Sequence, residues 1–263
     1  YAMKRIAVID IGKTNAKLAL VDAATLEEVQ VLTRPNRVLP GPPWPHFDLK
    51  GHWQFLCDGL KTFGPVDAIS VTTHGASAVG LDASGRALPM LDYEFDGPGG
   101  AEYDGLRPDF AATGSPRLGI GLNLGAQLAW LAGRPEWRPA HILTYPGYWG
   151  YLLTGQMSCD VTSLGCHTDL WEPGAARWSA LVDRLGIGPL MAPPRRPDEV
   201  LGGVTPEVAA RTGQRPGTPV TVGIHDSNAS LYPHVKARKG AFSVVSTGTW
   251  VVVMTMGGAT ALD

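Results

Sequence analysis

The chain has 263 residues, 44% of them hydrophobic and 17% charged, which is typical of a globular protein with one large domain or two small ones. A formal net charge of -2 provides no basic field, so neither nucleic acid nor an anionic membrane is expected as a partner. The apolar runs are too short to span a bilayer, no signal peptide is visible, and three cysteines favour a reducing compartment over a disulfide framework, so we expect a cytoplasmic protein.

The first part of the chain predicts three strands in succession, followed by a helix and a fourth strand. The strands are expected at 4–9, 16–21, 28–33 and 68–72, and the helix ends at Gly64-Pro65. Only six residues, 10–15, separate the first two strands, which is hairpin distance. This order is typical of a ribonuclease-H-like α/β domain, because a Rossmann or P-loop domain would place a helix directly after its first strand.

The middle of the chain predicts short helices and long loops. Helices are expected around 124–131, at 148–153 before Gly155, at 178–185, and from the cap Thr205 to Gly213. Strands are expected again at 219–222, 242–246 and 249–254. The last two strands start a new β meander, and a hairpin that opens a sheet needs partners. We therefore expect residues 3–240 to form one domain and residues 241–263 to be the first hairpin of a second domain of the same kind.

Two predicted hairpin tips carry glycine and hydroxyl residues. The first tip follows Asp10 and contains Gly12, Thr14 and Asn15. Its backbone N–H groups and side chains could bind a phosphate, and Asp10 could hold Mg²⁺, usually through water. The second tip, Thr247-Gly248-Thr249, repeats the pattern. For each tip alone, a simple tight turn explains the residues equally well, whereas two such tips facing each other could hold one polyphosphate.

Polar residues also follow two of the predicted buried strands. His225 and Asp226 come after the strand at 219–222, where a carboxylate could accept a proton from a sugar hydroxyl. The alternative is that Asp226 is simply a helix N-cap. His74-Gly75 follow the strand at 68–72 and suit a polyol, although a lone histidine is more often structural.

Two further polar groups are weaker candidates. Asp92-Tyr93-Glu94 could bind hydroxyl groups or face solvent. Cys159, Cys166 and His167 are too loosely spaced for a convincing zinc site.

Several segments, in order along the chain, resemble the FGGY family of carbohydrate kinases. They are DIGKTNAK, VTTHGASAVGLDASGRALP, GTPVTVGIHDSNAS and SVVSTGTWVVV, and the similarity extends from Lys4 to Met254. The HDSNAS and STGTW forms look most like the rhamnulokinase and fuculokinase branch. The resemblance implies an actin/hexokinase/Hsp70-type ATPase fold with ATP and Mg²⁺ as cofactors.

The resemblance also implies roles for individual residues. Asp226 matches the catalytic base, and Asp10 and Asp226 match the metal-linked carboxylates. The phosphates of ATP would be bound by Gly12, Lys13, Thr14, Asn15, Thr247, Gly248 and Thr249. The sugar would be bound by His74, Gly75, Tyr93, His225 and Asp226. Lys13 departs from the small or hydroxyl residue found in many members, and it could contact phosphate or point to solvent.

The function implied is transfer of the γ-phosphoryl group of ATP to a hydroxyl of a ketose such as L-rhamnulose or L-fuculose. The alternatives are a kinase of xylulose, glycerol or another polyol, and a non-catalytic sugar-binding protein of the same fold. The expected partners are thus a small-molecule sugar and ATP. A homodimer is left open, and the adenine-binding residues are expected to lie outside this sequence.

Overall fold

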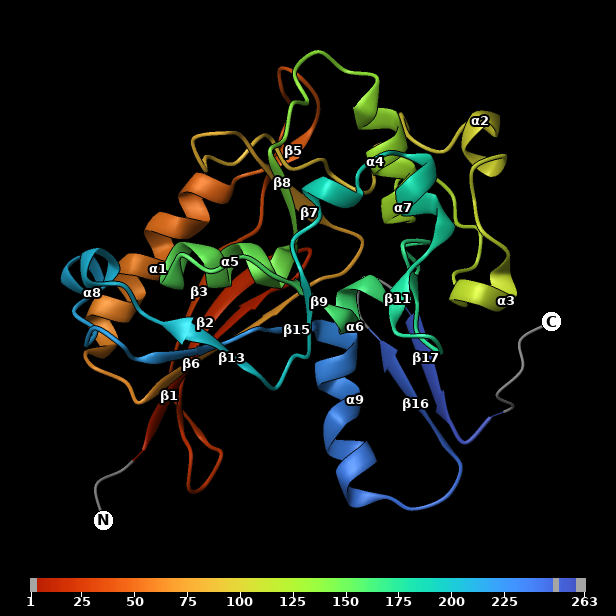
Figure 1. The fold of residues 1–263 in the computed structure, drawn as a ribbon. Helices are drawn as coiled ribbons and strands as arrows, with labels where there is room; N and C mark the ends of the chain where they lie inside the picture. Colours follow the sequence, from red (N-terminus) through yellow and green to blue (C-terminus); the bar gives the residue numbers. More distant parts are fainter. Residues whose placement is uncertain (1–3, 248–250, 259–263) are drawn as a thin grey trace.

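A mixed β-sheet forms the centre of the computed structural model, which describes residues 4–247 and 251–258 (Figure 1). In this part of the chain the sheet has seven strands in the order β13-β14-β6-β1-β2-β3, with β15 also paired to β6. The strands are β1 (Arg5–Ile11), β2 (Asn15–Asp22), β3 (Glu28–Pro35), β6 (Ala68–Thr73), β13 (Val200–Gly203), β14 (Pro219–Thr221) and β15 (Ile224–His225). The first three are antiparallel, whereas β1, β14 and β15 run parallel to β6. The ribonuclease-H-like arrangement is therefore confirmed.

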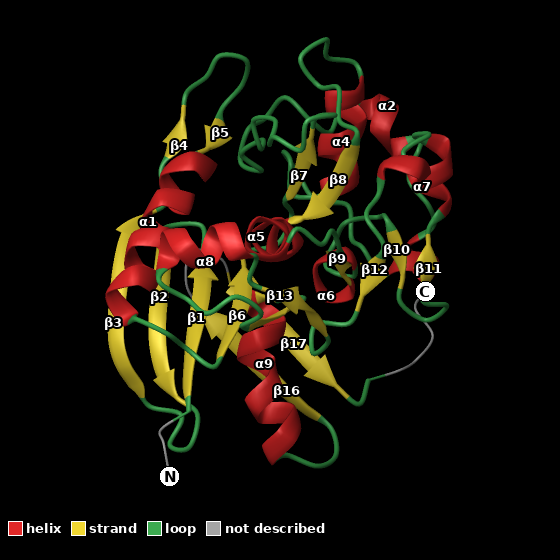
Figure 2. Ribbon diagram, turned by 60° about the vertical axis from the view of Figure 1, so that its left-hand side comes forward, coloured by secondary structure: helices red, strands yellow, loops and turns green. Residues whose placement is uncertain are grey.

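Three helices cover one face of this sheet: α1 (Leu49–Phe63), α5 (Tyr145–Thr154) and α8 (Pro206–Thr212) (Figure 2). Their apolar side chains pack on the buried side chains of β1, β2 and β6 to form the main core. The predicted ends of α8 are confirmed. The Thr205 side chain caps its start by accepting a hydrogen bond from the Val208 N–H, and Gly213 ends it with φ of 71°.

A second, smaller core lies beside the sheet, among short helices on the right in Figure 1. The helices α2 (Ala101–Asp104), α4 (Leu124–Ala132) and α7 (Ala180–Arg184) contribute side chains to it, together with the 3₁₀ turn at Gly188–Leu190. The short helix α3 (Phe110–Thr113) follows α2, and α6 (Val161–Leu164) packs on the main core. Short strand pairs lie outside the main sheet: β4 (Val38–Leu39) with β5 (His46–Phe47), β7 (Ala78–Leu81) with β8 (His141–Thr144), β9 (Cys159–Asp160) with β12 (Pro194–Arg195), and β10 (Trp171–Glu172) with β11 (Arg177–Trp178).

The helix expected at 178–185 is shorter than predicted. Trp178 belongs to β11 and lies opposite Trp171, with the ring centroids 5.5 Å apart. The helix α7 begins only after Ser179, whose hydroxyl accepts a hydrogen bond from the Leu181 N–H. The pairing of two tryptophans across a hairpin therefore overrides the helical spacing at the start of the segment.

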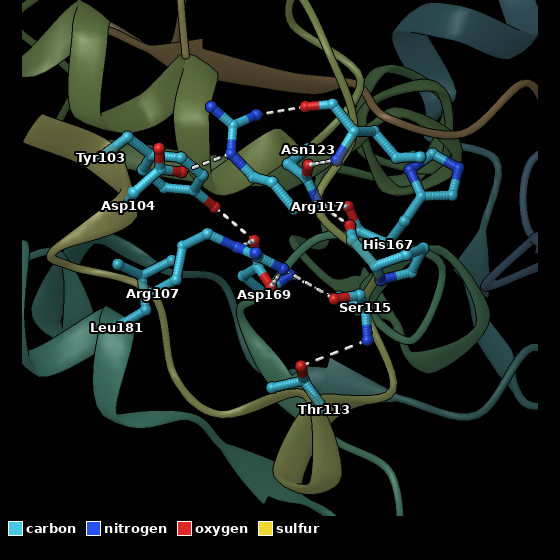
Figure 3. A network of polar contacts seen from close by, with 12 residues as sticks. Tyr103, Asp104, Arg107, Thr113, Ser115, Arg117, Asn123, His167, Asp169 and Leu181 are labelled. Carbon is cyan, nitrogen blue, oxygen red and sulfur yellow. Dashed lines mark hydrogen bonds and ion pairs between the residues drawn. The ribbon is translucent and has the colours of Figure 1, made fainter. Parts of the chain in front are cut away.

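A buried polar network connects the loops around the second core (Figure 3). At its centre lies Asp169, whose side chain is fully buried and accepts hydrogen bonds from the Tyr103 hydroxyl and the Arg107 guanidinium. Arg107 also donates to the Ser115 carbonyl, and Asn123 donates to the His167 carbonyl. A buried charge is tolerated only when it is paired in this way, so the network fixes these loops relative to one another.

The last described elements leave the main sheet. The helix α9 (Asp226–Ala237) follows β15, and β16 (Phe242–Thr247) and β17 (Val251–Met256) form an antiparallel hairpin. Among the described residues these two strands pair only with each other, and Val245, Val251 and Val253 are exposed. The expected strands thus exist, whereas the division into domains at 240 stays a prediction. Within residues 4–247 and 251–258, no helix is long and apolar enough to cross a bilayer.

Candidate functional site

The two candidate catalytic carboxylates come from strands on either side of β6. Asp10 near the end of β1 lies opposite Thr72 of β6, and Ile224 of β15 lies opposite the same threonine. Asp226 follows β15 directly, so both aspartates reach the carboxyl edge of the parallel strands. Burial raises the pKa of the Asp10 carboxyl, while Lys17 opposes this rise and the neighbouring Asp226 carboxylate adds to it. The structure therefore brings together the two carboxylates that the sequence placed 216 residues apart.

The interpretation of Asp226 as a helix N-cap is not supported, since His225 occupies the N-cap position of α9. Asp226 is the first helical residue, and its Oδ1 accepts a hydrogen bond from the adjacent Ser227 N–H at 2.6 Å. Its side chain is 39% exposed. The carboxylate is thus accessible from solvent at the sheet edge, as a base that meets a substrate must be.

The hairpin tip between β1 and β2 borders an open depression of about 480 Å³. The residues around it are Asp10, Gly12, Lys13, Thr14, Asn15, Lys17 and Thr33. Within the tip, the Gly12 N–H donates to the Asn15 carbonyl at 2.9 Å. The predicted phosphate residues of the first tip therefore do line one shared depression.

Asn36, which belongs to no predicted site motif, supports this tip through hydrogen bonds. Its backbone N–H donates to the Thr14 carbonyl and its Nδ2 donates to the Gly12 carbonyl, both at 2.8 Å. The Asn36 Oδ1 lies 2.7 Å from His52 Nε2, while His52 Nδ1 lies 3.2 Å from Arg34 Nη1. Because arginine only donates, His52 Nδ1 accepts and Nε2 carries the proton. The hydrogen bond from His52 Nε2 therefore fixes the orientation of the Asn36 amide, and through it the shape of the tip.

The Lys13 side chain points toward the acidic segment Asp92-Tyr93-Glu94, for which no link to the first tip was predicted. Its Nζ lies 2.5 Å from Asp92 Oδ1 and 3.1 Å from Glu94 Oε2, and it stands over the rings of Phe47 and Tyr93. The structure thus joins the first tip to the segment containing the candidate sugar residue Tyr93.

His74 lies next to this cluster and is almost completely buried. Its Nδ1 lies 3.0 Å from the Gly75 carbonyl, so Nδ1 carries the proton and Nε2 is an acceptor. Among the described residues Nε2 has no hydrogen-bond partner. Burial lowers the pKa of His74 to about 3, and the charge of Lys13 contributes. A neutral imidazole with one free acceptor is suited to a hydroxyl group of a ligand.

His225 connects the histidine segment with the carboxylate edge. A Cβ on Gly75 would lie 2.6 Å from His225 Nε2, so the absence of a side chain at Gly75 makes room for this ring. His225 Nε2 lies 3.2 Å from Asp226 Oδ1, and Nδ1 lies 2.9 Å from Asn228 Oδ1. Burial alone would lower the pKa of His225, but Cys166, Asp226 and Asn228 outweigh it and raise the pKa to about 9. Both ring nitrogens therefore donate, and the imidazolium orients the Asp226 carboxylate.

Cys166, whose spacing in the sequence did not support a zinc site, lies next to His225 at this site. Burial alone would raise the pKa of its thiol, yet hydrogen bonds with His167 and His225 lower it to about 6. Within residues 4–247 and 251–258, no group of three or more His, Cys, Asp or Glu side chains is arranged to hold a metal ion.

Of the second hairpin tip, only Thr247 can be placed. It ends β16 opposite Val251. Gly248 and Thr249 lie outside the described residues, so their predicted contact with phosphate stays a prediction.

Acid should destabilise the fold through His74. Above pH 6.5 the imidazole is neutral in both folded and unfolded chains, whereas below it only the unfolded chain takes up the proton until the folded pKa of about 3 is reached. The free energy of unfolding should therefore fall by about 1.4 kcal/mol per pH unit in this range. Denaturant unfolding on both sides of pH 6.5 should give a shallower slope for His74→Asn than for wild type. The exposed His141→Asn should keep the wild-type slope, and equal slopes for all three would contradict the assignment.

Known proteins resemble this chain in sequence and in fold. No family model matches the chain. A rhamnulokinase from Pectobacterium carotovorum is 26% identical over 95% of this chain and 52% of its own length. An autoinducer-2 kinase from an Enterobacter species is 29% identical over 80% of this chain and 43% of its own length. The chain spans about half the length of the curated relatives it matches.

Solved structures extend the similarity to the fold. A carbohydrate kinase from Novosphingobium aromaticivorans superimposes with a TM-score of 0.87 and 36% identity over 95% of this chain and 57% of that one. A glycerol kinase from Plasmodium falciparum, 16% identical over 95% of this chain and 54% of that one, has a TM-score of 0.76 and shares the fold alone. The sheet topology, the aligned sequences and these superpositions together make the chain similar to carbohydrate kinases of the FGGY family, with the actin/hexokinase-type ATPase fold.

Proposed function

We propose that this chain carries the sugar site and one phosphate-binding hairpin of an ATP-dependent sugar kinase. The observation that supports it most is the meeting of Asp10 and Asp226 at one sheet edge, beside the glycine-bearing tip and the partnerless His74 Nε2. Residues 3–240 would form the sugar-binding domain, and 241–263 would begin the nucleotide-binding one. We further propose that the protein works in the cytoplasm.

Asp226 would act as the base. Its carboxylate accepts the proton of a sugar hydroxyl while that oxygen bonds to the γ-phosphorus and the bond to the ADP oxygen breaks. The His225 imidazolium, 3.2 Å away, keeps the carboxylate pointed at the sheet edge. His74 would accept a hydrogen bond from a second hydroxyl, and the ring of Tyr93 would pack beside the sugar.

The donor set at the edge also fits Mg²⁺, since hard carboxylate oxygens are the ligands it prefers. Asp10 and Asp226 would hold it, largely through water, and it would neutralise phosphate charge. Gly12, Thr14 and Asn15 would bind phosphate oxygens through the tip that Asn36 supports. The second tip, Thr247-Gly248-Thr249, would approach the same phosphates from the other side.

The substrate proposed is a ketose such as L-rhamnulose or L-fuculose. The support is the similarity to rhamnulokinases over 95% of the chain. Relatives also include an autoinducer-2 kinase, and superimposable structures include xylulose, gluconate and glycerol kinases. A xylulose, glycerol or other polyol kinase is therefore the alternative.

The deciding experiment measures ADP release by the complete gene product across ketoses, polyols and sugar acids, with a no-sugar control. Release that depends on one or a few sugars is the expected result and names the substrate class. Binding of a sugar with no release in the presence of ATP and Mg²⁺ would instead support a non-catalytic sugar-binding protein of this fold.

A further inference from the structure

Lys13 occupies a position unusual for a residue at a phosphate-binding hairpin tip. Its side chain is only 14% exposed, and its ammonium contacts two carboxylates, those of Asp92 and Glu94. The same nitrogen lies 4.9 Å from the ring centroid of Phe47 and 4.7 Å from that of Tyr93. Lysine is rarely buried unless it is paired, and here four side chains surround it. We call Phe47, Asp92, Tyr93 and Glu94 the lysine cage.

The cage argues against a role for Lys13 as a phosphate ligand. To reach a phosphate, Nζ would have to leave two carboxylates and two ring faces. The Asp92 side chain, only 12% exposed, would then remain charged without its counter-ion. Removing one partner of a nearly buried ion pair is strongly unfavourable, because the other charge stays desolvated.

The cage leads directly to the candidate sugar site. The rings of Phe47 and Tyr93 both pack on the ring of His74, with centroid distances of 5.0 and 5.3 Å. The backbone N–H of Asp92 donates to the Pro45 carbonyl, which ties the acidic segment to the chain that carries Phe47. A continuous packed path therefore runs from the hairpin tip to the partnerless Nε2 of His74.

The opposite side of the tip is fixed independently. Asn36 holds the Gly12 and Thr14 carbonyls through the hydrogen bonds described above. Lys13 thus provides a side-chain link between this supported tip and the sugar-site segment, which lies 79 residues further along the chain.

We propose that Lys13 is a positioning residue that ties the phosphate hairpin to the sugar site and does not bind nucleotide phosphate. This rests on the proposed kinase function. By pinning the tip to the lysine cage, Lys13 keeps Gly12 and Asp10 at a set distance from the sugar held at His74. Loss of the ammonium would loosen the cage and shift the rings that enclose His74, so the sugar site would suffer first.

The first arm of the test uses steady-state kinetics of the complete gene product. Lys13→Met keeps the length and apolar stem but removes the charge, and Lys50→Met on the exposed face of α1 is the matched control. We expect Lys13→Met to raise the KM for the sugar by about tenfold and to leave the KM for ATP within about twofold. A rise in the KM for ATP with an unchanged KM for the sugar would make Lys13 a phosphate ligand and overturn the proposal.

The second arm needs no turnover. Thermal unfolding without ligands is measured for wild type, Lys13→Met, Asp92→Asn and the double variant. If the cage exists, the double variant should melt close to the less stable single variant, because each change already breaks the same pair. Additive shifts would overturn the proposal. If the wild-type protein releases no ADP with any sugar, the proposed function fails, and this cycle still decides whether Lys13 and Asp92 act as a pair.

Discussion

Asp226→Asn should reduce sugar-dependent ADP release by about 10²- to 10⁴-fold, the range typical of a removed general base. The amide keeps the size of the carboxylate but cannot accept the proton of the attacking hydroxyl. Its oxygen can still accept a hydrogen bond from His225 Nε2, so the local geometry should survive. Sugar affinity, measured by calorimetry, should therefore change little while kcat falls.

A matched control separates loss of a base from loss of charge. Asp183→Asn removes an exposed carboxylate from α7, in the second core, and should leave kcat at the wild-type value. If Asp226→Asn kept more than about a tenth of wild-type kcat, Asp226 could not be the base, because even modest general-base catalysis contributes more.

Asp169→Ala should lower the free energy of unfolding by about 3–5 kcal/mol, the cost of removing one partner of a buried ion pair. Arg107, 16% exposed, would lose its counter-ion, and the Tyr103 hydroxyl would lose its acceptor (Figure 3). Urea unfolding should report the change as a lower midpoint. Asp169 is hydrogen-bonded to Tyr103, Arg107, Ser115 and Ser179, none of which belongs to the carboxylate edge, so activity below the unfolding midpoint should persist.

An exposed aspartate tests whether burial of the ion pair causes the large loss of stability expected for Asp169→Ala. Asp198 pairs with Arg196 at 2.9 Å, yet both side chains are about two-thirds exposed, at 67% and 72%. Asp198→Ala should therefore leave the urea midpoint close to the wild-type value. Equal losses of stability for Asp169→Ala and Asp198→Ala would mean that the Asp169 network stabilises the fold no more than a surface ion pair does.

The sequence predicted those parts of the fold that depend on local pattern. The alternation of buried residues in β1, the cap at Thr205 and the stop at Gly213 are all set by neighbours a few residues away. The order of the predicted strands and helices along the chain was then sufficient to predict the fold class. Three antiparallel strands followed by a helix and a parallel strand leave few topologies open.

Contacts between distant segments were not predictable in the same way. Lys13 and Asp92 both lie in segments that the sequence marks as candidate sites, but nothing in the sequence indicates that these residues, 79 positions apart, share a hydrogen bond. Asn36 belongs to no motif, and its role appears only in the structure, where it contacts His52, which in turn contacts Arg34. For Asp226, local sequence could not distinguish a cap from a base, whereas the strand register places it beside Asp10.

The β16–β17 hairpin has a practical consequence for handling the protein. Within the part of the chain that the structure describes, the outer edges of this ribbon are unpaired, which makes them a template for other chains. Val245, Val251 and Val253 add exposed apolar side chains at 58%, 68% and 62%. In concentrated solutions of these 263 residues, this ribbon is where edge-to-edge self-association and precipitation should begin. A lysine in place of Val253 introduces the charge with which natural edge strands prevent such pairing, and it should raise solubility without touching the carboxylate edge.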